Sequence, residues 1–264
     1  MLSRLRALRP SSRPGILMMP SWFATPFVDS LLFVLSALEH HGFAYVAHRG
    51  LLLGAARLGG VLPWDDDSDV FLVDASAEDV AARVGPVLAD HGFALRFQPR
   101  GYYFNAYPRI FLPFPLAGLT ELGLLTRSVD AQGVHFDAHE PRRHLRQNEL
   151  YPIRRIPFHG SYVLGPSAAD LAAERMYGEL ASPATMSRFR RPEIAPSVAS
   201  FWREARPLEG PLDWPRISER FRRRMRSASF HLTQVPCSVW YLANRAYWVA
   251  MDGLRSLART PTGP

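Results

Sequence analysis

The chain has 264 residues, of which 47% are hydrophobic and 21% are charged, a composition normal for one large globular domain with an appendage. Its net charge is +7 and all 31 basic residues are arginine, which suits acidic partners such as nucleotides, phosphorylated lipids or nucleic acid. The one cysteine, Cys237, excludes a disulfide framework and a cysteine-rich zinc site, and no apolar run reaches about 18 residues, which argues against a transmembrane helix.

The N-terminal part predicts a flexible basic tail over residues 1–20, followed by a helix. The tail lacks the apolar core and the cleavage site of a signal peptide, so we expect a cytoplasmic protein. Basic amphipathic segments occur at both ends of the chain, and peripheral contact with the inner face of the membrane is therefore an alternative. Thr25-Pro26 predicts the helix start, with proline at the first helical position, and Gly42 predicts its end.

Strand and helix signals then alternate along the chain. The predicted elements are a strand over 43–47, a turn leading into a short helix over 50–57, a strand that begins in an acidic segment, a helix over 76–91, and a hairpin over 93–98 and 102–107. The sequence Ser76-Ala-Glu-Asp79 has the form of a capping box, with aspartate in place of the usual glutamate. Residues 108–133 are punctuated by proline and glycine and predict no element.

The C-terminal half adds weaker elements. They are a strand over 134–137, a second hairpin over 153–158 and 161–164, a helix over 167–177, a Pro/Arg-rich linker over 181–215 and one or two helices over 216–258. This order of elements predicts an α+β fold, with a small mixed sheet flanked by helices. We expect the main domain to cover residues 21–180, and a linker with a helical extension to cover residues 181–264.

The most informative segment is GAARLGGVLPWDDDSDV, residues 54–70. It places four carboxylates in five positions, namely Asp65, Asp66, Asp67 and Asp69. Like charges packed this closely either raise their pKa values or require a cation. Alternation puts Asp65, Asp67 and Asp69 on one side of an extended chain, and hard oxygen ligands suit Mg²⁺ or Mn²⁺. The hydrophobic run that follows places these carboxylates at the mouth of a buried strand.

Two other metal sites fit the pattern poorly. A calcium loop counted from Asp65 needs glycine at its sixth position and glutamate at its twelfth, where the chain has Val70 and Ser76. The segment His135–His139 has alternating ligands for zinc, but a lone short cluster of this kind is mostly a surface feature. The sequence therefore favours the magnesium or manganese interpretation.

Two segments carry a family resemblance. GLLLGAARLGGVLPWDDDSDVFLV, residues 50–73, resembles the signature of the LicD/fukutin family of phosphotransferases with a nucleotidyltransferase fold. YPIRRIPFHGSYVLGPSAADLAAERMYG, residues 151–178, is similar to the second block of that family. The resemblance spans about residues 43–180. It implies a reaction in which a hydroxyl of a glycan or lipid-linked glycan attacks the distal phosphorus of a CDP-linked donor. Phosphocholine or a polyol phosphate is transferred and CMP is released, as in lipopolysaccharide or teichoic acid biosynthesis.

The resemblance also implies roles for individual acidic residues. Asp67 and Asp69 correspond to the metal-binding pair, and Asp65 lies beside them as a further catalytic group. The family's third carboxylate comes from a neighbouring strand and serves as a metal ligand and general base. In this chain Asp137 is the best candidate for it.

Four residues are implied for donor phosphate and nucleotide binding: Arg49, Gly50, Gly54 and Arg57. The two glycines let the backbone approach the phosphate, because glycine has no Cβ atom. The family pattern has a glycine where Arg49 stands and a small hydroxyl residue where Leu51 stands. Arg49 takes over anion binding, or the donor differs, or catalysis has been lost.

Two further functions remain open at this stage. One is nucleotidyl transfer to a small molecule, an RNA or a protein, and the other is a catalytically inactive binding descendant of the fold. The arginine run over 220–226 is by default a solvated helix face, so nucleic acid is a disfavoured partner.

Overall fold

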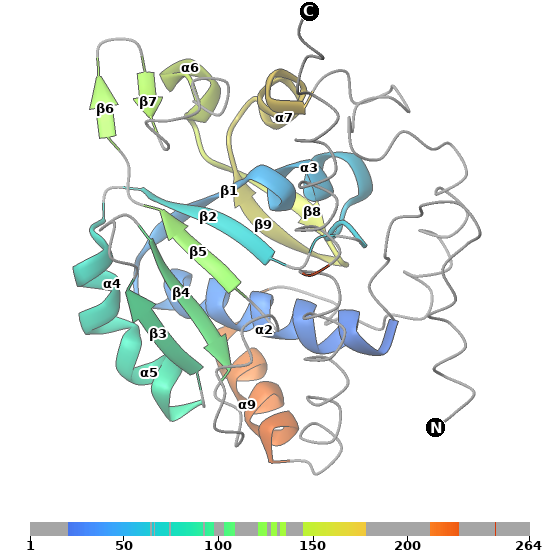
Figure 1. The fold of residues 1–264 in the computed structure, drawn as a ribbon, viewed down its shortest axis with the longest axis vertical. Coiled ribbons are helices and arrows are strands. Elements are labelled where there is room, and N and C mark those ends of the chain that lie inside the picture. The colour runs from blue at the N-terminus through green and yellow to red at the C-terminus, as the bar shows by residue number, and fades with distance from the viewer. Residues whose placement is uncertain are drawn as a thin grey trace, which may run out of the picture.

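A five-stranded mixed sheet lies at the centre of the fold (Figure 1). The computed structural model describes residues 21–63, 65, 67–73, 75–91, 93–97, 103–108, 121–125, 128–130, 133–135, 145–177, 212–226 and 246. The strand order is β1-β2-β5-β4-β3; β2 and β5 are parallel, and the other neighbours are antiparallel. These strands are β1 Ala44–His48, β2 Asp67–Val73, β3 Phe93–Phe97, β4 Tyr103–Pro108 and β5 Glu121–Leu125.

Helices and two small hairpins surround this sheet. The hairpins are β6 Ser128–Asp130 with β7 Gly133–His135, and β8 Arg154–Phe158 with β9 Ser161–Gly165. The helices are α2 Ser21–His40, α3 Arg49–Leu58, α4 Ala77–Arg83, α5 Gly85–Asp90, α6 Gln147–Leu150, α7 Ala169–Tyr177 and α9 Trp214–Met225. In the view of Figure 1, α2 runs across the picture below β2 with α9 beneath it, α3 and α7 lie above β2, and the β8–β9 hairpin lies to the right of β2.

Helix α2 is the centre of the hydrophobic core. Its side chains are buried from Phe27 to Leu38, because this stretch is apolar on nearly every face. The hydroxyl of Ser36 is satisfied within the helix, since it donates to Phe33 O at 2.9 Å. The buried carboxylate of Asp29 lies 4.0 Å from the guanidinium of Arg220 on α9. No helix in the described part of the chain combines the length and apolar character needed to cross a membrane.

An aromatic cluster fixes α9 against α2. The ring of Phe33 stacks on Phe221 with the centroids 4.4 Å apart, and it also contacts Phe93 and Trp214. Both Ile217 and Phe221 are buried. The inner face of α9 therefore belongs to the core of the main domain.

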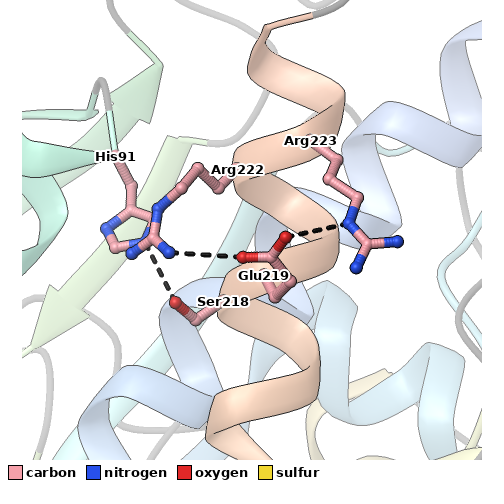
Figure 2. Close-up of polar contacts among 5 residues, drawn as sticks. All are labelled: His91, Ser218, Glu219, Arg222 and Arg223. Carbon is pink, nitrogen blue, oxygen red and sulfur yellow. Dashed lines mark hydrogen bonds and ion pairs between the residues drawn. The ribbon is translucent and has the colours of Figure 1, made fainter.

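Polar contacts supplement this packing (Figure 2). His91 Nδ1 donates to Val87 O at 2.8 Å, so its Nε2 accepts from Ser218 Oγ at 3.0 Å. On the exposed side of α9, Glu219 pairs with Arg222 and Arg223 at 3.3 and 2.9 Å. The predicted solvated arginine face is confirmed for these two arginines.

Several predicted elements are confirmed. They are the strand at 43–47, the hairpin of β3 and β4, the hairpin of β8 and β9, the helix that ends at Tyr177, and the capping box of α4. In that box, Ser76 Oγ accepts from the Asp79 amide at 3.0 Å and the Asp79 carboxylate accepts in return. A mixed sheet flanked by helices is likewise confirmed.

Other boundaries were wrong. Helix α2 begins at Ser21, before Thr25-Pro26, so the proline lies inside it and lacks the amide hydrogen of a regular helix bond. The turn expected at residue 50 is already helical, because α3 begins at Arg49. The helix predicted over 76–91 divides into α4 and α5, and α5 begins at Gly85 with Pro86 in its first turn.

The stretch 108–133, for which no element was predicted, contains strands β5 and β6. The strand predicted over 134–137 is β7, which ends at His135. Residues 1–20 and 178–211, and the region after 226 apart from Ala246, lie outside the described residues. The predictions for the tail, for the linker and for a second C-terminal helix therefore stay predictions.

Candidate active site

Two of the predicted metal ligands lie at the start of strand β2, which pairs with β1 on one side and β5 on the other. Asp67 is its first residue and Asp69 its third, and Val70 to Leu72 behind them are fully buried. Asp69 pairs in register with His48 on β1 and with Gly123 on β5. The acidic residues thus lie at the mouth of a buried strand, as the sequence predicts.

Asp65 lies against the start of α3. A Cβ atom on Gly50 would be only 1.7 Å from Asp65 Oδ2, so the carboxylate occupies space that any other residue at position 50 would fill. The Asp65 amide donates to Leu62 O at 3.0 Å, which turns the chain just before β2. Asp65 therefore precedes β2, which begins at Asp67. The expectation of one row formed by Asp65, Asp67 and Asp69 stays a prediction, because the side chain of Asp67 lies outside the described part of the structure.

Arg49 connects α3 to β2. Its Nη1 lies 3.3 Å from Asp69 Oδ2, and the two side chains are 21% and 14% exposed. Its backbone has φ 46°, in the left-handed region that favours glycine. The Arg49 guanidinium thus pairs with Asp69, while the Asp65 carboxylate lies against the first turn of α3.

A glycine-rich turn leads from α3 to the acidic segment. Gly59 ends the helix with φ 64°, and the amides of Gly59 and Gly60 donate to Ala55 O and Gly54 O at 3.1 and 3.3 Å. A Cβ atom on Gly54 would lie 2.4 Å from Gly60 O. Gly54 is therefore required for the close approach of this turn.

His159 holds the turn from the opposite side. Its Nε2 accepts from the Val61 amide at 3.0 Å, and its own amide donates to Gly59 O at 2.7 Å. A Cβ atom on Gly60 would lie 2.6 Å from the imidazole ring. Burial lowers the pKa of His159 to about 3, so the ring is neutral and its Nε2 is free of a proton. We call these contacts the His159 latch.

The hairpin that carries His159 is itself fixed to the sheet. His159 and Gly160 both have positive φ, at 51° and 72°, as a two-residue type I′ turn requires. Close to this turn, Tyr162 Oη donates to Glu39 Oε2 on α2 at 2.8 Å, and Tyr45 Oη on β1 donates to Glu39 Oε1 at 3.0 Å. Burial, with Glu39 nearby, raises the pKa of Tyr45 well above its usual range, so this hydroxyl keeps its proton.

The structure brings together four of the predicted site residues, which are Arg49, Gly50, Asp65 and Asp69. Arg57 lies in the last turn of α3, about 12 Å along the helix axis from Arg49. For Asp67 only the backbone position is described, and Asp137 lies outside the described residues.

The carboxylates of Asp65 and Asp69 are hard oxygen donors, and Asp69 already holds a cationic group. Among the described residues, no three His, Cys, Asp or Glu side chains gather as a metal site. The carboxylate oxygens of Asp65 and Asp69 are ligands of the kind that Mg²⁺ or Mn²⁺ prefers.

Two residues of the site region could not be identified from the sequence. Glu121 opens β5 and pairs directly with Asp67 in the parallel ladder, but its strand lay in a stretch where no element was predicted. His159 was assigned to a hairpin turn, yet its bond to Val61 joins positions 98 apart in sequence. Local patterns carry no signal for either contact.

Comparisons with known proteins agree on one family. Residues 42–168 match the family model described as LicD/FKTN/FKRP, nucleotidyltransferase domain. Two relatives, the ribitol 5-phosphate transferases FKRP of Mus musculus and Homo sapiens, are each 35% identical over 81 residues. The matched stretch covers 29% of this chain and 16% of each relative.

Solved structures of the antibiotic-resistance factor ANT(2'')-Ia are also similar. A crystal structure with adenylyl-2''-tobramycin has a TM-score of 0.40 and 17% identity, covering 76% of this chain and 98% of that one. A solution structure has a TM-score of 0.37 and 16% identity, covering 87% and 96%.

The acidic strand start, the glycine-dependent approach of α3 and the family match together support a transferase. More narrowly, residues 42–168 of this chain resemble the nucleotidyltransferase domain of the LicD/FKTN/FKRP family.

Proposed function

We propose that the chain is a divalent-metal-dependent phosphotransferase that moves a phosphorylated alcohol from a CDP-linked donor to a hydroxyl of a free or lipid-linked glycan. The observation that carries the proposal is the meeting of Arg49, Asp65 and Asp69 at the start of α3. Guanidinium and helix-start amides recognise phosphate, while the carboxylates recognise a hard cation. The names of the FKRP relatives point to ribitol phosphate as one donor group.

The proposed reaction is an in-line displacement. The acceptor oxygen forms a bond to the distal phosphorus, the bond from that phosphorus to the CMP oxygen breaks, and the acceptor proton passes to a carboxylate. When bound, Mg²⁺ or Mn²⁺ would neutralise the negative charge on the transferring phosphoryl group. Asp67 and Asp69 would hold it, with Asp65 beside them. Arg49 would bind and orient the diphosphate.

The proposed general base needs a position beside the metal ligands. We propose Glu121 for this role, because its backbone position pairs with that of Asp67 in the parallel ladder of β2 and β5. Asp137, the candidate from sequence, remains the alternative.

Glu121→Gln is expected to lower turnover by about 10²-fold, because it removes the proton acceptor and keeps the shape of the side chain. Asp137→Asn should then change turnover by less than about threefold, well below the general-base effect. The measurement is the rate of CMP release by each variant at saturating donor. The reverse order of effects would restore Asp137 as the third carboxylate.

The decisive test of the proposed function is CMP release from CDP-choline, CDP-ribitol, CDP-glycerol and CDP-ethanolamine with Mg²⁺ or Mn²⁺. We expect one donor to be preferred and its turnover to stop with EDTA. Incubation with ATP or CTP and an aminoglycoside tests nucleotidyl transfer in parallel. Pyrophosphate release in that arm, with no CMP from any CDP donor, would overturn the phosphotransferase proposal in favour of nucleotidyl transfer.

A further inference from the structure

The backbone of Arg49 is strained at the first position of α3. Its φ of 46° lies in the left-handed region, which is unfavourable for a residue other than glycine. Strain of this kind persists where the surrounding structure enforces it, and it concentrates at functional sites. The strained backbone therefore indicates a functional role for the Arg49 side chain.

The Arg49 guanidinium neutralises a carboxylate that the proposed reaction needs for its metal. Nη1 lies 3.3 Å from Asp69 Oδ2, and both side chains are largely withdrawn from water. Charges interact more strongly in such surroundings than at the surface. A divalent cation that approaches Asp69 therefore meets a positive group already in contact with its ligand.

Arg49 is also adjacent to the place where a donor phosphate would bind. The next residue, Gly50, lies directly against the Asp65 carboxylate. Arg49 and Gly50 both belong to the first turn of α3. The amides of that turn attract anions, and a planar guanidinium binds two phosphate oxygens at once. Asp69 and a phosphate bound at this turn are thus both suitable acidic partners for Arg49.

We propose that Arg49 is an internal counter-ion that competes with the divalent cation for Asp69 and passes to the donor diphosphate when cation and donor bind together. This inference rests on the proposed metal-dependent reaction and adds to it an interdependence of cation and donor binding. The cation binds weakly to the free protein and tightly once the nucleotide diphosphate has drawn Arg49 away. Metal and donor affinities are then coupled, and by linkage the coupling is the same in both directions.

The test is Mn²⁺ binding, followed by electron paramagnetic resonance of the free ion, with and without CDP. In the wild type, CDP should tighten Mn²⁺ binding by about 5- to 150-fold, the usual range of such coupling. In Arg49→Gln, Mn²⁺ should bind more tightly by a similar factor without CDP, and CDP should add little. Arg223→Gln is the matched control, because it removes the same charge from the exposed face of α9. It should behave as the wild type.

Arg49→Gly guards against a folding defect. Glycine adopts φ 46° without strain, so this variant should melt no earlier than the wild type and should show the same tightened Mn²⁺ binding. Equal or weaker Mn²⁺ affinity in both Arg49 variants would overturn the competition while leaving the phosphotransferase proposal standing. If none of these proteins, the wild type included, binds Mn²⁺ with or without CDP, the metal-dependent reaction itself is overturned, and the competition with it.

Discussion

Asp69→Asn is expected to lower donor-dependent CMP release by on the order of 10³-fold, because it removes a charge that faces the transferring phosphoryl group. The fold should survive. The variant loses its ion pair with Arg49, but it also relieves repulsion among neighbouring carboxylates, so the free energy of unfolding should change by about 1 kcal/mol or less. Stopped assays of CMP at saturating donor and metal give the first quantity, and urea unfolding gives the second.

The matched control for this variant is Asp90→Asn, at the exposed end of α5, which should keep full turnover. Asp67→Asn should be as inactive as Asp69→Asn, because both residues open the same strand. If Asp67→Asn and Asp69→Asn both turn over at the wild-type rate, the metal assignment is wrong, whatever the protein is found to bind.

Local chemistry explains why the hairpins and the capping box were predictable. Ser76 and Asp79 bond each other within one helical turn, and the β8–β9 hairpin closes around a two-residue turn with positive φ. Such features are written in a few consecutive residues. The acidic segment was found for the same reason, since its carboxylates lie next to a run that must be buried.

Long-range contacts explain what the sequence did not reveal. Strand β5 is defined by its parallel pairing with β2, and its five residues, ELGLL, show no strict alternation. Arg49 was predicted to bind anions, but its ion pair with Asp69 depends on how α3 lies beside β2. The same holds for the docking of α9, where Phe221 meets Phe33 across most of the chain.

His159→Ala is expected to lower the free energy of unfolding by about 2–4 kcal/mol at pH 7.5, because it leaves a cavity and a buried amide without an acceptor. The Val61 amide is buried and would lose its acceptor, and the turn that leads to Asp65 would lose one of its two bonds to the hairpin. CMP release should fall as well, because Asp65 follows that turn by four residues. Urea unfolding at fixed pH measures the first effect.

The latch also makes a pH prediction whose sign follows from the burial of the ring. The pKa of His159 is lowered to about 3 from its ordinary value of 6.5, so between these values the unfolded chain binds a proton that the folded chain does not. Its contribution to stability is complete above pH 6.5 and is lost as pH falls toward 3. The slope is about 1.4 kcal/mol for each pH unit within that window.

His159→Gln isolates this effect from the titration of other groups. Its amide oxygen can accept from the Val61 amide but does not titrate, so at pH 7.5 the variant should be less stable than the wild type by about 1 kcal/mol. Because only the wild type loses stability through residue 159 as the pH falls, the two stabilities should converge and then cross above pH 4. A difference that stays constant from pH 7.5 to 4 would mean that the ring is not held neutral in the fold. If the two stability curves cross and His159→Gln keeps the metal affinity of the wild type, the segment 151–178 acts by holding the turn before the acidic segment.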